Sequence, residues 1–405
     1  MDISNDEYRR DPYPVYAELR RRAPVYKVPP PFDAWMIFDY EGVNRALNDH
    51  EAFSNHVPAP PNWFIFQDPP AHTRLRGLVS KAFTPRIVAR IEPFIRRLSH
   101  SLLAQVLDRG RMDVATDFAA PLAMRVIAHI IGIPDADWPK FRAWSDSILK
   151  ISYSRGADDE ARQVIKEFAE VAVEMNEYLT MMLAERRQSP RDDLLTHLMT
   201  AEIEGQRLAP AEILGFFQLL VVAGQDTTAN LINNAVLSLL ENPSQLALLR
   251  SNLRLLDSAI EETMRYRAPI QWVMRTPTRT IEMDSQSLLR GQLILAVIGS
   301  ANRDSKVFDR AEEFDITRDP NPHLSFGHGV HYCIGSALAR MEARIGLHDL
   351  LSNLTEIERD GDGPWEPRRA LHVYGPAHLG IRFRRSQSSD VNAASEESAL
   401  PRSGL

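Results

Sequence analysis

The stretch from Pro210 to Leu240 limits more than any other how this chain can fold. It reads PAEILGFFQLLVVAGQDTTANLINNAVLSLL, and its middle is apolar on every face of a helix. A helix of this kind is usually buried along its length rather than placed on a surface. The sequence therefore predicts one long central helix covered by other elements. Apolar residues make up 44% of the 405 residues, enough to bury a core of that size.

The rest of the chain is predicted to be mainly helical, with few and short strands. Apolar residues recur at helical spacing, and capping residues, prolines and glycines mark the ends of the segments. The expected helices cover residues 68–83, 84–110, 121–134, 135–152, 157–188, 189–202, 251–269 and 334–351. The expected strands cover residues 34–38, 292–298, 370–374 and 378–383.

The domain organisation is expected to be simple. Residues 1–385 contain no internal repeat and no linker, so they are predicted to form one domain. Residues 386–405 have no aromatic residue and are rich in serine and small residues, and this tail is predicted to be disordered.

Charge and cysteine content limit the partners and the compartment. The formal net charge of −7 argues against nucleic acid or an anionic membrane surface as the main partner. The first residues lack the basic and then apolar order of a signal peptide, and no run reaches the roughly 18 apolar residues of a membrane helix. A single cysteine permits no internal disulfide, which fits a reducing compartment. We expect a soluble, cytoplasmic protein.

That cysteine, Cys333, lies in the segment FGHGVHYCIG, residues 326–335. A lone cysteine without this context is a small buried hydrophobe. The glycines allow tight turns beside a flat group, and the helical sequence that follows puts the sulfur at a helix N-terminus, which lowers a thiol pKa. A zinc site with His323, His328 and His331 is the alternative, but structural zinc sites prefer several thiolates. The segment therefore favours a thiolate that binds a metal or cofactor.

A second unusual segment, AGQDTT, spans Ala223 to Thr228 in the middle of the apolar helix. Acidic and hydroxyl groups are costly to bury without partners. A threonine hydroxyl can bond the carbonyl four residues back and bend the helix, and Gly224 removes side-chain bulk at the same place. A bend with internally satisfied side chains is one explanation. The other is a groove over a flat cofactor, which we favour.

Together these segments resemble the cytochrome P-450 family. FGHGVHYCIG looks like its haem-binding loop, AGQDTT like its oxygen-activation segment, and EETMR, residues 261–265, like a third signature. They occur in the family's order, and the resemblance extends to about residue 385. It implies a cytochrome P-450 haem domain with a mainly α fold and small β-sheets (α+β). The helical domain would be triangular, with haem b between the long central helix and the helix that follows the cysteine loop.

The resemblance also implies roles for individual residues. Cys333 would be the axial ligand of the haem iron, and Asp226 and Thr227 would control proton delivery during oxygen activation. Glu262 and Arg265 would form a buried structural pair, and four cations would contact the haem propionates. The full set of expected haem contacts is His72, Arg76, Ala223, Arg275, Phe326, His331, Cys333 and Gly335.

The reaction implied is insertion of one oxygen atom of O2 into a hydrophobic small molecule, by hydroxylation or epoxidation. The chain shows no flavin or iron–sulfur motif, so electrons would come from NAD(P)H through a reductase and a ferredoxin or flavodoxin. That partner would dock on positive charge at Arg74, Lys81, His328 and Arg344, and the enzyme is expected to be a monomer. The expected substrate contacts are Trp63, Phe64, Gln218, Val222, Trp272, Val273 and Tyr374.

Two other functions are compatible with haem binding. One is a peroxide-driven peroxygenase, and the other is a non-catalytic haem-binding or ligand-binding protein. Members of the family driven by peroxide commonly lack the acid–threonine pair, and a binding protein has no need for it. Asp226 and Thr227 therefore argue against both.

Overall fold

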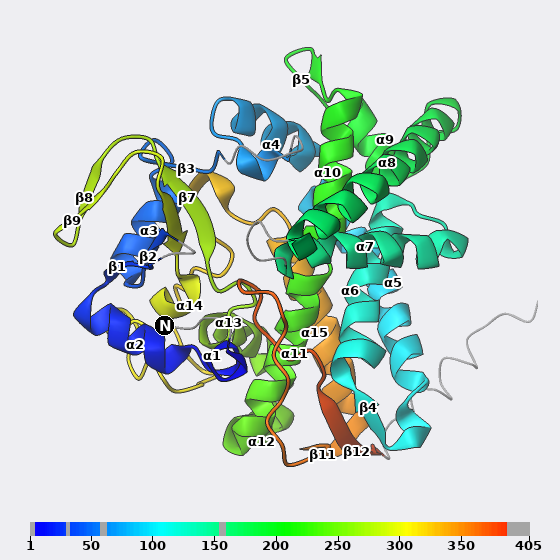
Figure 1. The fold of residues 1–405 in the computed structure, drawn as a ribbon. Coiled ribbons are helices and arrows are strands. Elements are labelled where there is room, and N and C mark those ends of the chain that lie inside the picture. The colour runs from blue at the N-terminus through cyan, green and yellow to red at the C-terminus, as the bar shows by residue number, and fades with distance from the viewer. Residues whose placement is uncertain (1–4, 30–32, 57–62, 154–158, 387–405) are drawn as a thin grey trace, which may run out of the picture.

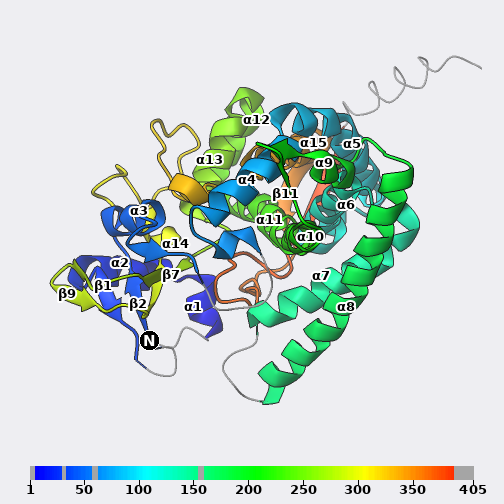
Figure 2. The same ribbon diagram turned by 90° about the horizontal axis from the view of Figure 1, so that it is seen from above.

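Helices dominate one side of the molecule, and a small sheet occupies the other (Figure 1). The structure, a computed structural model, describes residues 5–29, 33–56, 63–153 and 159–386. Seen from above, α10 (Pro210–Ala223) and α11 (Asp226–Glu241) lie near the centre, with other helices around them (Figure 2). The mainly α architecture with small sheets agrees with the fold class expected from the sequence.

The other helices are α1 (Asp6–Arg10), α2 (Tyr13–Arg22), α3 (Tyr40–Asn48), α4 (Ala71–Ala82), α5 (Pro85–Ala104), α6 (Ala120–Ile131), α7 (Trp138–Tyr153), α8 (Asp159–Gln188), α9 (Leu194–Thr200), α12 (Pro243–Ser251), α13 (Leu256–Tyr266), α14 (Ile298–Ala301) and α15 (Ser336–Asn353). The strands are β1 (Val25–Lys27), β2 (Ala34–Ile37), β3 (Phe53–Ser54), β4 (Arg111–Asp113), β5 (Glu202–Ile203), β6 (Gln206–Arg207), β7 (Val273–Pro277), β8 (Ile281–Met283), β9 (Gln286–Leu288), β10 (Leu293–Ala296), β11 (Leu354–Arg359) and β12 (Gly380–Arg385).

The central helix predicted over residues 210–240 is in fact two helices. α10 ends at Ala223, and α11 begins at Asp226. Gly224 lies between them because the chain has no room for a side chain there: a Cβ atom would approach Ile127 Cδ1 to 2.3 Å. After the break, α11 is buried on nearly all its faces and packs against α6, α13 and α15. The polar segment thus divides the helix, where the sequence suggested only a bend.

The larger sheet has five strands in the order β1-β2-β10-β7-β3. β2 and β10 run parallel, with Leu293 opposite Ala34, and β7 pairs antiparallel to β10, with Arg275 opposite Ile294. A second sheet has the order β11-β12-β4. The predicted strands near residues 34, 292 and 378 are confirmed, but residues 370–374 are not a strand. They contribute only an isolated bridge between Ile270 and Val373, because they belong to a loop that turns back at Gly375.

One described helical segment is long and apolar enough to cross a membrane by length and composition. It is Val114–Ile131, and 67% of it is buried inside the protein. A core helix passes the same test, and this segment packs against α5 and α11. Asp117 and Arg125 interrupt this segment, so it is not an uninterrupted apolar run, and its burial in the core explains its apolar composition.

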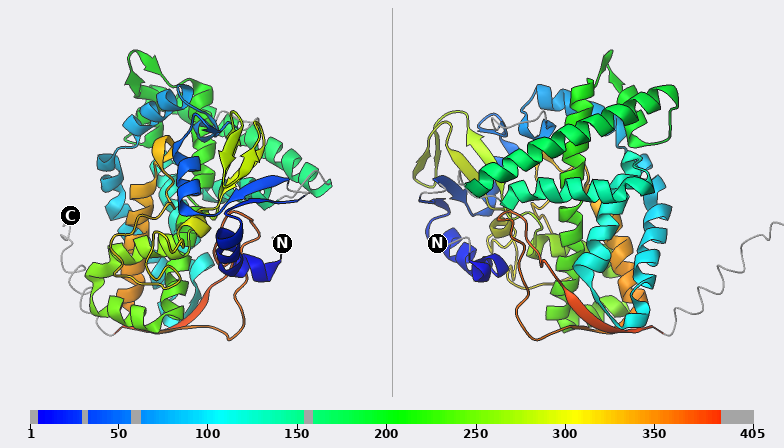
Figure 3. Two further views of the ribbon diagram at one scale, coloured as in Figure 1. Left: turned by 90° about the vertical axis from the view of Figure 1, so that its left-hand side faces the viewer. Right: turned by 45° about the vertical axis from the view of Figure 1, so that its right-hand side comes forward.

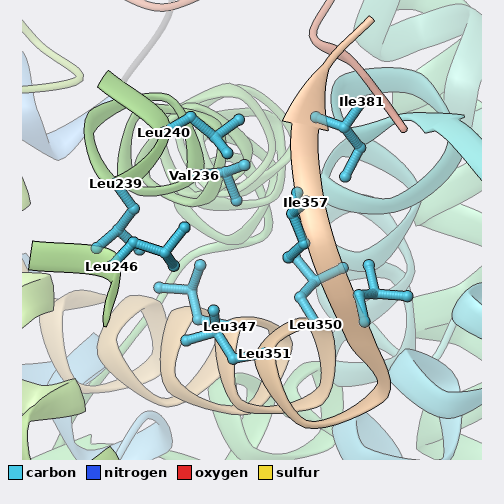
Figure 4. Close-up of a pocket in the computed structure, with 10 residues that line it drawn as sticks. Val236, Leu239, Leu240, Leu246, Leu347, Leu350, Leu351, Ile357 and Ile381 are labelled. Atoms are coloured by element: carbon cyan, nitrogen blue, oxygen red, sulfur yellow. The ribbon is translucent and has the colours of Figure 1, made fainter. Parts of the chain in front are cut away.

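A small cavity of about 20 Å³ lies in the core between α11, α15 and the second sheet. Ten aliphatic side chains line it, among them Val236, Leu347 and Ile381 (Figure 4). No titratable side chain lines this cavity, so it is a packing defect of the core and not a reaction site.

The chain leaves the described region directly after β12. The Ser386 backbone N–H donates to the Asn353 carbonyl at 2.8 Å, which ties the end of the sheet to the end of α15. The prediction of a disordered tail falls on residues 387–405, which lie outside the described residues.

Candidate active site

The loop before α15 is a sequence of tight turns. Gly327 and Gly329 adopt φ angles of 73° and 65°, a region that suits glycine. Gly329 also approaches α3 closely, since a Cβ atom there would lie 2.6 Å from Asn48 Oδ1. The Cys333 backbone N–H donates to the Phe326 carbonyl at 2.8 Å and closes the loop. These turns bring the sulfur to the start of α15, as the sequence predicted.

Cys333 itself has an exposed side chain, unlike a structural cysteine packed in a core. Although solvent reaches the side chain, the protein atoms packed around the sulfur remove much of its hydration, and this desolvation raises the pKa of the thiol. The backbone N–H of Gly335 and the charges of Arg76 and Arg340 act in the opposite direction but do not prevail. The sequence predicted that the position at a helix N-terminus lowers this pKa, whereas in the protein by itself desolvation of the sulfur outweighs the Gly335 N–H and the two cations.

Four basic side chains, two histidines and two arginines, gather beside this loop from three different elements. The rings of His72 on α4 and His331 in the loop lie 4.0 Å apart. Burial, then repulsion from His72, Arg275 and Arg76, lowers the pKa of His331 to about 3. Burial, then Arg76, lowers the pKa of His72 to about 4. The repulsion shows that the predicted propionate contacts are brought together.

These four side chains form no ion pair with a described carboxylate, although the charge of Asp68 acts on His72 and Arg275. Arg76 donates to the Tyr332 carbonyl at 2.5 Å, and Arg275 donates to the carbonyls of Ala46 and Met274. Both ring nitrogens of His72 and Nε2 of His331 are buried without a hydrogen-bond partner. Buried polar groups are normally satisfied, so the cluster suits an anionic ligand with several acceptor oxygens. The two propionates of haem b fit that requirement.

The break between α10 and α11 supplies the acid and hydroxyl groups. Thr227 Oγ1 donates to the Ala223 carbonyl at 2.6 Å, which confirms the expected bond four residues back. Ala223 is exposed although its helix is otherwise largely buried. Asp226 is 3% exposed, and burial raises its pKa, with Arg368 opposing and Asp146 reinforcing the effect. One face of the break is therefore open, and the carboxyl group lies behind it.

The pair Glu262 and Arg265 is fully buried on α13. Arg265 donates to both carboxylate oxygens at 2.7 and 2.8 Å and to the carbonyls of Asn302, Ala311 and Glu313. Glu262 also accepts from the Asp315 backbone N–H and from Arg318. The pair thereby holds the segment that leads to the cysteine loop.

The neighbouring Glu261 was not singled out from the sequence, yet it contacts residues on both sides of the cysteine loop. Arg340 on α15 donates to it at 2.6 and 2.8 Å, and His323 contacts it at 3.0 Å. Arg340 also lies over the Phe326 ring at 4.3 Å. The repeated glutamate in EETMR was the available signal, because adjacent helical residues point in different directions and serve different neighbours.

The expected substrate contacts lie in different environments. The Gln218 side chain is occupied: its Oε1 accepts from Trp63 at 3.3 Å, and its Nε2 donates to Asn176 at 3.1 Å. Tyr374 is buried against Tyr13 and Trp365 and donates to the Arg10 carbonyl, which makes it a core residue.

The remaining candidates keep some exposure or lie next to the cation cluster. Val222, Trp272 and Val273 are partly exposed, and Phe64 is buried beside His72. Val273 begins β7, the strand that carries Arg275. These four residues therefore remain the stronger candidates for substrate contact.

The zinc alternative finds no support among the described residues, which contain no group of three or more His, Cys, Asp or Glu side chains able to hold a metal ion.

Three of the four expected docking cations already interact with other residues of the protein. Arg74 pairs with Glu212, Lys81 donates to the Glu202 carbonyl, and His328 contacts Asn44. Arg344 forms no ion pair with a described carboxylate and is partly exposed.

The thiol of Cys333 is exposed and lies near basic side chains that form no ion pair. No group of three or more possible metal ligands accompanies it among the described residues. Such a thiol suits an iron porphyrin that is held by a thiolate. The site therefore places the protein among the haem-thiolate oxygenases. The family model for cytochrome P-450 matches residues 31–371. This chain belongs to the cytochrome P-450 family, and it is a haem b monooxygenase that acts on small molecules.

Individual relatives cover nearly the whole chain. The biotin biosynthesis cytochrome P-450 of Bacillus subtilis (strain 168) is 36% identical over 395 residues, covering 94% of this chain and 98% of the relative. The structure of CYP109Q5 from Chondromyces apiculatus has a TM-score of 0.88 at 33% identity, covering 95% of this chain and 98% of that one. CYP109E1 from Bacillus megaterium, in complex with corticosterone, has a TM-score of 0.86 at 34% identity, covering 93% and 99%.

Proposed function

We propose that Cys333 holds the haem iron, that His72, Arg76, Arg275 and His331 bind the propionates, and that Asp226 and Thr227 control proton delivery. The observation that carries this assignment is the position of the chain's only thiol, exposed at the N-terminus of α15 and near four basic side chains that form no ion pair with a described carboxylate. When bound, the haem supplies the oxygen activation and the substrate oxidation, and a thiolate ligand favours O–O cleavage. Phe326 and Gly335 shape the loop around the sulfur.

Two residues of the chain, Thr227 and Asp226, then position hydrogen bonds and supply protons at the site. The Thr227 hydroxyl is held by the Ala223 carbonyl at the break between α10 and α11, so its oxygen keeps lone pairs free to accept a further hydrogen bond. The Asp226 carboxyl next to it lies in a buried environment that raises its pKa and so favours the neutral, proton-carrying form. Two adjacent groups that can hold and pass a proton support a monooxygenase that uses O2 over a peroxygenase that uses peroxide.

The partners follow from the same assignment. Electrons come from NAD(P)H through a ferredoxin or flavodoxin that docks near Arg344. The substrate is a hydrophobic small molecule that contacts Phe64, Val222, Trp272 and Val273. We further propose that residues 1–385 form the haem domain and that the enzyme is a cytoplasmic monomer.

A two-step experiment tests the proposal. A compound library is first screened for ligands that shift the haem spectrum from low to high spin, and steroids belong in it because the similar CYP109E1 structure holds corticosterone. Each hit is then incubated with NAD(P)H, a ferredoxin and its reductase, or with hydrogen peroxide alone. We expect an oxygenated product only with the electron-transfer chain. Product from peroxide alone at a comparable rate would identify a peroxygenase instead.

A further inference from the structure

The carboxyl group of Asp226 has two oxygens in different situations. Oδ1 lies 3.3 Å from Nη1 of Arg368, and the two side chains are only 4% and 17% exposed. Oδ2 is buried and has no hydrogen-bond partner in the described protein. One oxygen is thus fixed by a cation, while the other remains available for a proton or a water molecule.

Arg368 belongs to a loop, residues 366–377, that crosses the start of α11. Its backbone N–H donates to the Gly375 carbonyl at 3.1 Å, and Pro367 and Pro376 form a bridge across the loop. Arg9 of α1 donates to the Arg368 carbonyl at 3.3 Å. Figure 3 shows this orange-red loop beside the dark-blue N-terminal helices.

The same loop packs tightly onto α11. A Cβ atom on Gly375 would approach Asn230 Oδ1 to 2.4 Å, and Asn234 donates to the Tyr374 carbonyl at 3.0 Å. The backbone of the loop is therefore packed onto α11, which keeps the Cα of Arg368 near the start of the helix that carries Asp226.

A cavity of about 20 Å³ lies on the other side of Arg368, between α1, α2 and the loop. Arg9, Gln271 and Arg368 line it, and the Nε donors of Arg9 and Arg368 are buried without a partner in the described protein. The Oε1 atom of Gln271 also has no partner, but it lies against Gly299, which is not part of the cavity lining. A polar cavity above about 10–15 Å³ with two to four such groups suits one water molecule. The guanidinium of Arg368 thus contacts both this cavity and Asp226.

We propose that Arg368 is the positioning residue for proton delivery: it holds Oδ1 of Asp226 so that Oδ2 exchanges the proton, and water reaches the pair through the cavity beside it. This inference rests on the proposed role of Asp226. Arg368 remains cationic throughout, because a guanidinium does not deprotonate in proteins. The proton moves from water to Oδ2 and then towards the Thr227 side, so the carboxyl is regenerated in each cycle.

The charged groups that act on Asp226 are Arg368 in the loop and Asp146 on α7. Burial raises the pKa of Asp226 and Arg368 lowers it, so removal of Arg368 should raise it further. A nearby opposite charge lowers the pKa of a carboxyl. The midpoint at which Asp226 takes up its proton should therefore move to higher pH in Arg368→Gln.

The experiment compares Arg368→Gln and Arg368→Lys with Arg369→Gln, an exposed neighbour that loses the same charge. The carbonyl stretch of protonated Asp226 is titrated by infrared difference spectroscopy on resting holoenzyme, with Asp226→Asn to assign the band. We expect the midpoint to rise in Arg368→Gln and to stay near the wild-type value in Arg368→Lys and Arg369→Gln. The fraction of NAD(P)H recovered as product should fall several-fold in Arg368→Gln only.

The two proposals fail in different ways. If Asp226→Asn lowers this fraction but Arg368→Gln changes neither the midpoint nor the fraction, Arg368 has no positioning role. If Asp226→Asn leaves the fraction unchanged, the proposed role of Asp226 fails, whatever the titration shows. A high-resolution crystal structure of the holoenzyme adds an independent check. A water bonded to Nε of Arg368 is expected, and a dry cavity would overturn the access route.

Discussion

At the scale of a single side chain, the proposed haem ligation depends on one residue, Cys333. It is the only cysteine of the chain, and its exposed side chain lies at the N-terminus of α15. Replacement by alanine should abolish the long-wavelength Soret band of the reduced carbon monoxide complex, because no other thiol can take its place. The spectrum is measured on reconstituted protein, and an unchanged band in Cys333→Ala would refute the assignment.

Thr227 provides the second prediction at this scale. A positioned group that transfers protons typically contributes about 10²–10⁴-fold to a reaction. Thr227→Ala should keep the haem but divert a several-fold larger share of reducing equivalents to hydrogen peroxide, because the ordered proton path is lost. The measurement is the ratio of product and peroxide to NAD(P)H consumed. Thr227→Ser keeps the hydroxyl and should stay close to the wild type, whereas equal loss in both variants would point to packing rather than proton control.

Residues with a distinctive sequence context could be predicted, and residues placed only by the fold could not. Cys333, Thr227 and the cation pair His72 and Arg76 stand in recognisable segments, and the structure brings the cations together beside the cysteine loop. Arg368 stands in an unremarkable segment near the end of the chain. Arg368 and Asp226 are 142 positions apart, and their contact depends on the path of the loop that carries Arg368. No local sequence pattern therefore predicts this contact.

At the scale of elements, the helices were largely predictable, while interruptions and loops were less so. Helical periodicity gave α4 to α8, α13 and α15 because each has an apolar face. The division of the central segment into α10 and α11 arises from tertiary packing of Gly224 against Ile127, which periodicity does not contain. Residues 370–374 alternate like a strand, yet they form a loop because α11 and the N-terminal helices occupy both sides of it.

The cluster of Glu261, Arg340 and His323 leads to a prediction on stability, because it ties α13, α15 and the cysteine loop together. Burial alone would raise the pKa of Glu261, but hydrogen bonds from Arg340 and His323 outweigh it and lower the pKa from 4.5 to about 2. A carboxylate with a lowered folded-state pKa stabilises the fold above its unfolded pKa. That stabilisation is lost as the pH falls from about 4.5 towards 2.

Thermal unfolding of the holoenzyme at pH 7, 4.5 and 3 tests this prediction. Glu261→Gln should unfold at a lower temperature than the wild type at pH 7, and the difference should shrink as the pH falls. Glu177→Gln, at an exposed position of α8, is the matched control and should change little at any pH. A difference between Glu261→Gln and the wild type that is constant across the three pH values would rule out this ion cluster as its source.

At the scale of the whole molecule, the site is assembled from both sides of the structure. Arg275 comes from the five-stranded sheet, His72 and Arg76 from α4, and Cys333 from the loop before α15. A ligand bound to all of them therefore connects the sheet side with the helical side. Because the site residues come from different elements, the sequence of each segment predicted which residues belong to the site but not the distances between them.

Docking of an electron donor is also a property of the whole surface. Among the four expected docking cations, Arg344 on α15 is the one that forms neither an ion pair nor a side-chain hydrogen bond with a described residue. Arg344→Glu should slow reduction by ferredoxin several-fold at low salt and weaken the salt dependence, since exposed charges mainly affect association rates. Stopped-flow reduction measures both. Arg290→Glu, in the turn between β9 and β10, carries the same charge change away from this surface and should behave like the wild type. Equal effects in the two variants would indicate only a change in net charge.

The close approach of Gly329 to Asn48 constrains how the chain can evolve. Any side chain at position 329 meets an unfavourable backbone angle and collides with a residue almost three hundred positions earlier. A substitution there should therefore be tolerated poorly even when position 48 becomes smaller, because the backbone angle stays unfavourable and the Cα atom of Asn48 would still lie 3.2 Å from the added Cβ atom. Mutant libraries of the cysteine loop should then retain glycine at position 329 in nearly all active clones, whether or not position 48 is varied with it.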